Sequence, residues 1–147
     1  MQRVSRASVE VDGVIVGSIH AGLLLLLGIE PSDTDEDISV GVDKVVNLRI
    51  FPDGAGQMNR SLLETGGSAL VVSQFTLLGD ARRGRRPSFV GAAPPEEAEP
   101  MVGRFVELLR TTGTHVETGV FGASMEVELV NSGPVTMVLE ITNGRVR

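Results

Sequence analysis

The sequence contains no cysteine, tryptophan or tyrosine, and it has only two histidines. Without cysteine there is no disulfide, no thiolate zinc site and no cysteine nucleophile, and nothing points to an oxidising compartment. His20 and His115 lie far apart, and neither has the spacing of a metal ligand to another ligand, so we favour a structural role for both. We therefore expect no metal and no cofactor.

Long apolar runs are also missing. The longest, Leu23–Leu27 followed by Gly28 and Ile29, is far short of the ~20 residues that a membrane-spanning helix needs. The first residues lack the charged and then apolar segments of a signal peptide, and no glycine-rich phosphate loop precedes a Lys-Ser or Lys-Thr pair. The sequence predicts a cytoplasmic protein with no membrane partner, and it does not support nucleotide hydrolysis.

The composition is that of an ordinary folded protein. With 147 residues, 41% of them hydrophobic and 22% charged, we expect one domain over residues 1–147 with a real core. The net charge of -6 argues against non-specific nucleic-acid binding, because phosphate affinity comes from clustered lysine and arginine. One short segment differs, and it is either a solvated loop or a phosphate contact: Arg82, Arg83, Arg85 and Arg86, around Gly84.

The stretch Gly67–Leu77 organises the chain. Ala69–Val72 are consecutive apolar residues, which is typical of a central strand covered on both faces. Ser73, Gln74 and Thr76 follow where solvation is poor, so their polar groups need partners. Those partners are either part of a turn or part of a substrate.

The remaining pattern predicts a strand-rich α+β fold with two helices. Asp12-Gly13 is a hairpin signal between the first two strands, and the period changes to a helical one after Thr34. Pro100 requires that the second helix start late or be kinked. We expect strands at 3–11, 14–19, 22–29, 48–51, 125–129 and 135–141, helices at 34–47 and 98–113, a long loop at 52–67, and Asn131–Pro134 as a hairpin loop joining the last two strands.

Two polar segments remain as candidates for chemistry: Ser73–Thr76 at the end of the central strand and Asn131–Pro134. Neither supplies an evident general base, which is unusual for a hydrolytic site. Any catalysis would depend on positioning.

Four segments together resemble the D-aminoacyl-tRNA deacylase family. They are Ser73-Gln74-Phe75-Thr76-Leu77, the Asn131–Thr136 stretch (Asn-Ser-Gly-Pro-Val-Thr), the Gly84–Phe89 stretch (Gly-Arg-Arg-Pro-Ser-Phe) and the Gln2–Val9 stretch (Gln-Arg-Val-Ser-Arg-Ala-Ser-Val). The match runs over nearly the whole chain, in order and at family-like spacing. It is therefore far more specific than a single motif.

The resemblance implies a homodimeric cytoplasmic enzyme with a mixed α/β fold, largely antiparallel sheets forming a barrel-like core and two helices packed outside. The reaction implied is hydrolysis of the ester between a D-amino acid, or glycine mischarged on tRNA(Ala), and the terminal adenosine of tRNA. Carried over to this chain, the catalytic residues are Ser73, Gln74 and Thr76; the substrate-binding residues are Phe75, Gly133, Pro134, Arg3 and Asn131; and the tRNA-binding residues are Arg82, Arg83, Arg85 and Arg86.

In that family the Gly-Pro peptide is cis and its carbonyl oxygens face the partner subunit's pocket, so Gly133 and Pro134 would select chirality. Two parallel carbonyls can accept bonds from the substrate's α-ammonium, so that an L side chain collides and a D side chain does not. The ester's neighbouring 2′-hydroxyl can orient water without any histidine. Thr76 acting as nucleophile is the alternative, although no residue nearby in sequence is an obvious activator.

Two departures and two other functions remain open. Ser132 stands where the family often has an acid, and Leu78 where it often has tyrosine; both concern fine tuning more than activity. The other functions are an editing domain that removes L-amino acids from mischarged tRNA and a non-catalytic tRNA-binding module that uses the arginines. The sequence does not indicate the preferred amino acid or tRNA.

Overall fold

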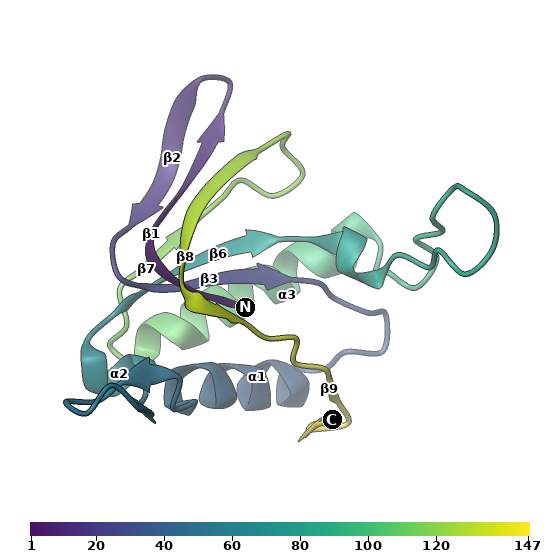
Figure 1. Ribbon diagram of the computed structural model, residues 1–147. Helices are drawn as coiled ribbons and strands as arrows, with labels where there is room; N and C mark the ends of the chain where they lie inside the picture. Colours follow the sequence, from purple (N-terminus) through teal and green to yellow (C-terminus); the bar gives the residue numbers. More distant parts are fainter.

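The computed structural model describes residues 1–147, and six of its ten strands form one sheet built around β1 and β3 (Figure 1). The predicted turn at Asp12 and Gly13 is confirmed, since both residues have positive φ, 50° and 78°, as a tight hairpin turn requires. β1 (Gln2–Val11) pairs antiparallel with three strands. β8 (Glu126–Thr136) lies along one of its edges, and β3 (Gly22–Leu27) and β2 (Val14–Ile19) lie along the other.

The half of the sheet that ends in β7 is parallel. β6 (Ser68–Ser73) pairs in parallel with β3, and β7 (Val116–Thr118), a strand that we did not predict, pairs in parallel with β6. β2 approaches β7 at Gly17, where a Cβ would lie 2.6 Å from the Thr118 carbonyl oxygen, so only glycine permits this contact. The sheet is thereby nearly closed, and the predicted barrel-like α+β fold class is confirmed.

Two long helices cover one face of the sheet, as predicted (Figure 1). α1 (Asp35–Asn47) and α3 (Pro95–Thr111) pack an apolar stripe against β3 and β6, and a smaller apolar cluster fills the inside of the barrel. The central strands therefore have apolar side chains on both faces, which explains the uninterrupted run at Ala69–Val72. Their fully buried members include Leu23, Leu24, Leu70, Val71 and Val72.

Three predictions for residues 48–113 need correction. The predicted long loop contains a short helix, α2 (Leu62–Thr65), capped reciprocally by Ser61 and Glu64, which is a signal that the many glycines obscured. α3 begins at Pro95, so the late start is excluded as one of the two alternatives for Pro100, which lies inside the helix on its exposed side. The predicted strand at 48–51 is reduced to β4 (Phe51–Pro52), which pairs with β5 (Met58–Arg60).

No helix combines the length and the apolar character needed to cross a membrane. After β8 the chain ends in a small hairpin of β9 (Ile141–Thr142) and β10 (Arg145–Val146), which lies beside α1 (Figure 1).

A buried carboxylate ties this hairpin to α1. Asp37 accepts hydrogen bonds from the Gly144 N–H (2.8 Å) and from the Thr34 hydroxyl (2.7 Å) and N–H (2.9 Å), so it both caps the helix and holds the chain end. The Gly144 N–H, and then the Thr34 hydroxyl, hold the pKa of Asp37 below its ordinary value. Ile141 packs nearby against Gly41, where a Cβ would lie only 3.1 Å from its Cδ1.

We expect Asp37→Asn to lower the free energy of unfolding by about 1–2 kcal/mol at neutral pH, because the charged acceptor of several bonds is lost. The folded-state pKa is depressed, so this stabilisation is complete above the unfolded-state value of about 3.9 and disappears as the pH falls through the folded-state pKa. Urea unfolding at a series of pH values should show the gap between wild type and variant closing below about pH 4. The control is Asp43→Asn, on the exposed side of the same helix. An equal effect of both substitutions, or a gap independent of pH, would contradict this role.

Candidate active site

The polar segment Ser73–Thr76 begins where β6 ends. β6 pairs with β3 as far as Ser73 opposite Leu27, and the Gln74 N–H then donates to the Leu27 carbonyl oxygen (2.8 Å). From Phe75 the chain turns into the 3₁₀ helix η1 (Phe75–Leu78). Successive side chains of a strand point to opposite faces, so the side chains of Ser73–Thr76 can share one site only because the strand ends here.

The side chains of this segment contact one another. Gln74 Nε2 donates to the Thr76 Oγ1, so the threonine hydroxyl oxygen is an acceptor for an amide. No acidic or basic side chain hydrogen-bonds to Thr76. Thr76 itself is exposed, whereas Ser73 and Gln74 are half-buried.

A cavity of about 410 Å³ opens beside this segment. Ser73, Gln74 and Phe75 form one wall, but Thr76 does not line it. The other walls come from α3, from the segment that precedes it and from the loop after β7, and they are mainly apolar: they include Phe89, Pro94, Ala98, Val102 and Phe121. An apolar cavity with a few polar groups at one wall is typical of a small-molecule site.

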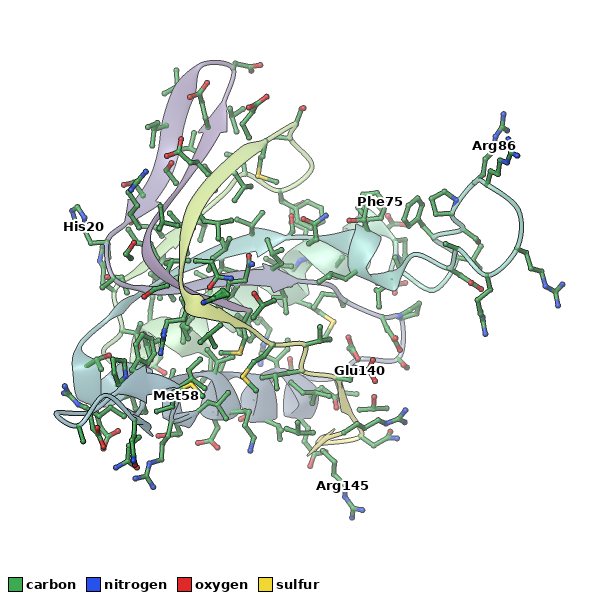
Figure 2. The ribbon with its side chains drawn as sticks, in the orientation of Figure 1. His20, Met58, Phe75, Arg86, Glu140 and Arg145 are labelled. Carbon is green, nitrogen blue, oxygen red and sulfur yellow. The ribbon has the colours of Figure 1, made fainter.

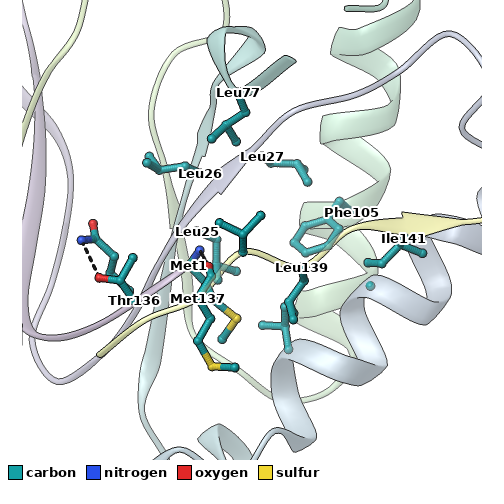
Figure 3. A pocket seen from close by; sticks show the side chains of 14 residues that line it. Met1, Leu25, Leu26, Leu27, Leu77, Phe105, Thr136, Met137, Leu139 and Ile141 are labelled. Carbon is teal, nitrogen blue, oxygen red and sulfur yellow. Dashed lines mark hydrogen bonds between the residues drawn. The ribbon is translucent and has the colours of Figure 1, made fainter. Parts of the chain in front are cut away.

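A second cavity, of about 300 Å³, lies between β3, the two long helices and the segment after β8 (Figure 3). Eleven of its 14 lining residues are hydrophobic. Its polar side chains, Gln2 and Thr136, bond to each other (3.1 Å), so they are already satisfied. The cavity beside Ser73 is therefore the better candidate for binding a polar substrate.

The segment Asn131–Pro134 is not the predicted hairpin loop. It lies within β8, whose two halves both pair with β1: Asn131 stands opposite Val4, and Thr136 opposite Gln2. The residues between them form a bulge, because more residues of β8 than of β1 separate these two pairs. We call residues 131–135 the β8 bulge. The Gly133–Pro134 peptide in it is cis, as the resemblance implies.

Side chains hold the β8 bulge in shape. The Asn131 amide spans it, accepting from the Val135 N–H and donating to the Thr136 hydroxyl, both at 2.8 Å. Arg3 Nε donates to the Ser132 carbonyl oxygen (2.9 Å) and Arg3 Nη1 to the Ile50 carbonyl oxygen (2.6 Å).

Gly133 leaves no room for another residue type. Its φ is 129°, and a Cβ there would lie 2.7 Å from Arg3 Nη2 and 2.9 Å from Val135 Cγ2. Gly133 and Pro134 are both exposed, and no residue of the β8 bulge lines the Ser73 cavity. Within one protomer, the two polar segments are therefore separate.

Known proteins resemble this chain over nearly its whole length. The family model described as "D-Tyr-tRNA(Tyr) deacylase" matches residues 1–140. The chain belongs to the D-aminoacyl-tRNA deacylase family. Relatives named "D-aminoacyl-tRNA deacylase" include one from Thermomicrobium roseum, 61% identical over 140 residues (95% of this chain, 91% of the relative), and one from Fervidobacterium nodosum, 54% identical over 140 residues (95% and 94%).

Solved structures give the same family fold. A protein titled "c-Myc DNA Unwinding Element Binding Protein" is 41% identical, with a TM-score of 0.87 over 92% of this chain and 93% of its own. A "probable eukaryotic D-amino acid tRNA deacylase" has a TM-score of 0.79 over 89% and 91%, but at 18% identity it supports the fold alone.

In this D-aminoacyl-tRNA deacylase, Arg3 and Asn131 both lie at the β8 bulge. We predicted that both bind substrate, but in the protomer their polar groups contact the β8 bulge and Ile50 instead. Asn131 begins the bulge, and Arg3 lies opposite it because β1 pairs with β8, which no local pattern reveals. Their roles remain predictions.

The four arginines of this D-aminoacyl-tRNA deacylase differ from one another. Arg82 is paired with Asp80 through Nη2 (2.7 Å) and Nε (2.9 Å), and these bonds lower the pKa of Asp80. Arg83, Arg85 and Arg86 are exposed on a loop that projects from the body of the protein, with Arg86 near its tip (Figure 2). Three of the four charges are therefore available to a partner.

Proposed function

We propose that this protein hydrolyses the ester bond of D-aminoacyl-tRNA and releases the D-amino acid and the tRNA. The observation that carries the proposal is the mainly apolar cavity whose polar wall is Ser73–Phe75, in a chain 61% identical to a relative named for this activity. The cavity has the size for an aminoacylated nucleoside end. Glycine mischarged on tRNA(Ala) is also a proposed substrate, because glycine has no side chain that the site could exclude. The proposed location is the cytoplasm.

The active unit is a homodimer in which the β8 bulge of one protomer faces the Ser73 cavity of the other. Two observations support this arrangement: the bulge is fully formed yet exposed, and it does not line its own protomer's cavity. Large apolar side chains are also exposed near both places, including Phe75, Leu77, Val127, Val130 and Val138. A second copy would cover such surfaces.

In this arrangement the Gly133 and Pro134 carbonyl oxygens select chirality. They would accept bonds from the substrate's α-ammonium, which leaves space for a D side chain and places an L side chain against the backbone. The hydrogen bonds of Asn131 and Arg3 support this role. Backbone carbonyl groups can exclude an L side chain only if the backbone is held rigidly in place.

The chemistry is driven by positioning and by the substrate's own 2′-hydroxyl. Thr76 Oγ1 accepts a bond from the Gln74 amide, which occupies one of its lone pairs and makes it a poorer nucleophile. No base bonds to its hydroxyl. Ser73 and Gln74 would instead orient the ester and water beside the 2′-hydroxyl.

Hydrolysis assays with three substrates test this function and its chemistry together. We expect D-Tyr-tRNA to be cleaved at least about 100-fold faster than L-Tyr-tRNA, and D-Tyr-tRNA ending in 2′-deoxyadenosine to bind but react very slowly. Thr76→Ala should reduce the rate less than the loss of the 2′-hydroxyl does.

Each other outcome has a definite meaning. Preferential cleavage of L-Tyr-tRNA would indicate an editing domain for L-amino acids, and tRNA binding without cleavage would indicate a binding module. An inactive Thr76→Ala variant combined with normal cleavage of the deoxy substrate would make Thr76 the nucleophile.

The arginine loop supplies tRNA affinity in this proposal. Replacing Arg85 and Arg86 by alanine should weaken tRNA binding, and the slope of log K against log salt should fall by about one to two, because fewer counterions are released. Arg82→Ala should change that slope less, since Asp80 already pairs with this charge. Filter binding at several salt concentrations provides the measurement, with Arg145→Ala on the C-terminal hairpin as the control. If Arg85 and Arg86 can be replaced without effect at low salt, the loop is only solvated.

A further inference from the structure

Phe89 contacts both ends of the 3₁₀ helix that carries Thr76. Its ring packs edge to face against Phe75, with centroids 5.1 Å apart and planes at 76°. The same ring lies across Gly79, directly after η1, where a Cβ would be only 2.9 Å from Phe89 Cε1. A single side chain thus holds η1 at its first residue and at its C-cap.

Phe89 also follows the base of the arginine loop. Asp80 and Ser88 close that base with two backbone hydrogen bonds, Asp80 N–H to Ser88 O (2.7 Å) and Ser88 N–H to Asp80 O (2.8 Å). Beyond Phe89 the chain is fixed again, because the N–H of the buried Ala93 donates to Ile29 O (2.8 Å). Because the chain is held on both sides of Phe89, a displacement of the arginine loop would also displace the Phe89 ring.

The tip and the base of the arginine loop have different chemistry. Three unpaired arginines lie in the projecting part of the loop, while Phe75 lies near its base, beside the cavity (Figure 2). Phosphate groups of a bound RNA would hold the loop, and the Phe89 ring would hold η1.

We propose that Phe89 is a positioning residue that transmits RNA engagement by the arginine loop to the segment Gln74–Thr76. This inference rests on the proposed function and deepens it: RNA bound on the loop sets the geometry of the reacting segment. Phe89 also lines the cavity, so the test must separate positioning from the simple loss of a cavity wall.

Steady-state kinetics with D-Tyr-tRNA make that separation. Phe89→Leu should lower kcat by about 10- to 100-fold and leave KM nearly unchanged, because a misplaced segment impairs the reaction more than binding. Phe89→Tyr keeps the ring and should restore most of kcat. Phe121→Leu, which alters only the opposite cavity wall, should instead raise KM, and Val90→Ala, next to Phe89 and 90% exposed, should change neither.

An unchanged kcat with a raised KM for Phe89→Leu would overturn the inference, and so would a failure of Phe89→Tyr to restore kcat. Thermal unfolding of each variant shows whether it is folded. If wild type itself cleaves no D-Tyr-tRNA, the proposed function fails, and a second measurement that needs no catalysis then decides on Phe89.

Fluorescence provides that measurement, since the chain has no tryptophan or tyrosine. Phe89→Trp introduces a single strong fluorophore at the contact. The probe is an RNA duplex without the single-stranded 3′ end, so it cannot fill the cavity. Adding this duplex should shift the tryptophan emission, and replacing both Arg85 and Arg86 by alanine should abolish the shift. An emission unaffected by the duplex, or a shift that survives loss of both arginines, would overturn the coupling.

Discussion

The parallel pairing of β3 with β6 determines where this protein can place chemistry. Both strands have apolar residues against the helices on one face and inside the barrel on the other, so no polar side chain is tolerated along them without a partner. The pairing stops at Leu27 and Ser73. Polar residues appear at that point, and the backbone turns away into η1. Ligands commonly bind beyond the carboxyl ends of parallel strands for the same reason.

The pairing of β1 with β8 is the second constraint, and it shapes the β8 bulge, which is the other half of the proposed site. Because β8 pairs with β1 on both sides of residues 131–135, the β8 bulge is fixed at both ends. Asn131 and Arg3 then fill its interior with hydrogen bonds. The result is an exposed backbone surface of defined shape, as a filter built from carbonyl groups requires.

Local patterns predicted much of this fold, and long-range pairing accounts for most of what they missed. The Asp12-Gly13 turn, α1 and the buried run at Ala69–Val72 are strong local signals, and each appears as predicted. The β8 bulge looked like a hairpin loop because Asn-Ser-Gly-Pro is turn chemistry, and only the shared partner β1 shows otherwise.

In the candidate site, too, local patterns predicted some features and long-range contacts determine the others. Ser73, Gln74 and Phe75 share a cavity because a strand ends there, which the polar Ser73 and Gln74 after an apolar run indicated. Phe89 gave no signal of its own, since its contacts with Phe75 and Gly79 depend on the path of the loop between them. The positions of Arg3 and Asn131 depend in the same way on strand register.

The central claim is that each active site needs the β8 bulge of one protomer and the Ser73 cavity of the other. Gly133→Val, which disrupts the bulge, and Ser73→Phe, which fills the cavity, should each be folded and inactive as pure proteins. After the two variants are unfolded together and refolded, D-Tyr-tRNA hydrolysis should return to about a quarter of the wild-type rate, because half of the dimers are mixed and each of these has one intact site. A mixture that stays inactive while mixed dimers form would contradict the account, since every protomer would then need both features in its own chain.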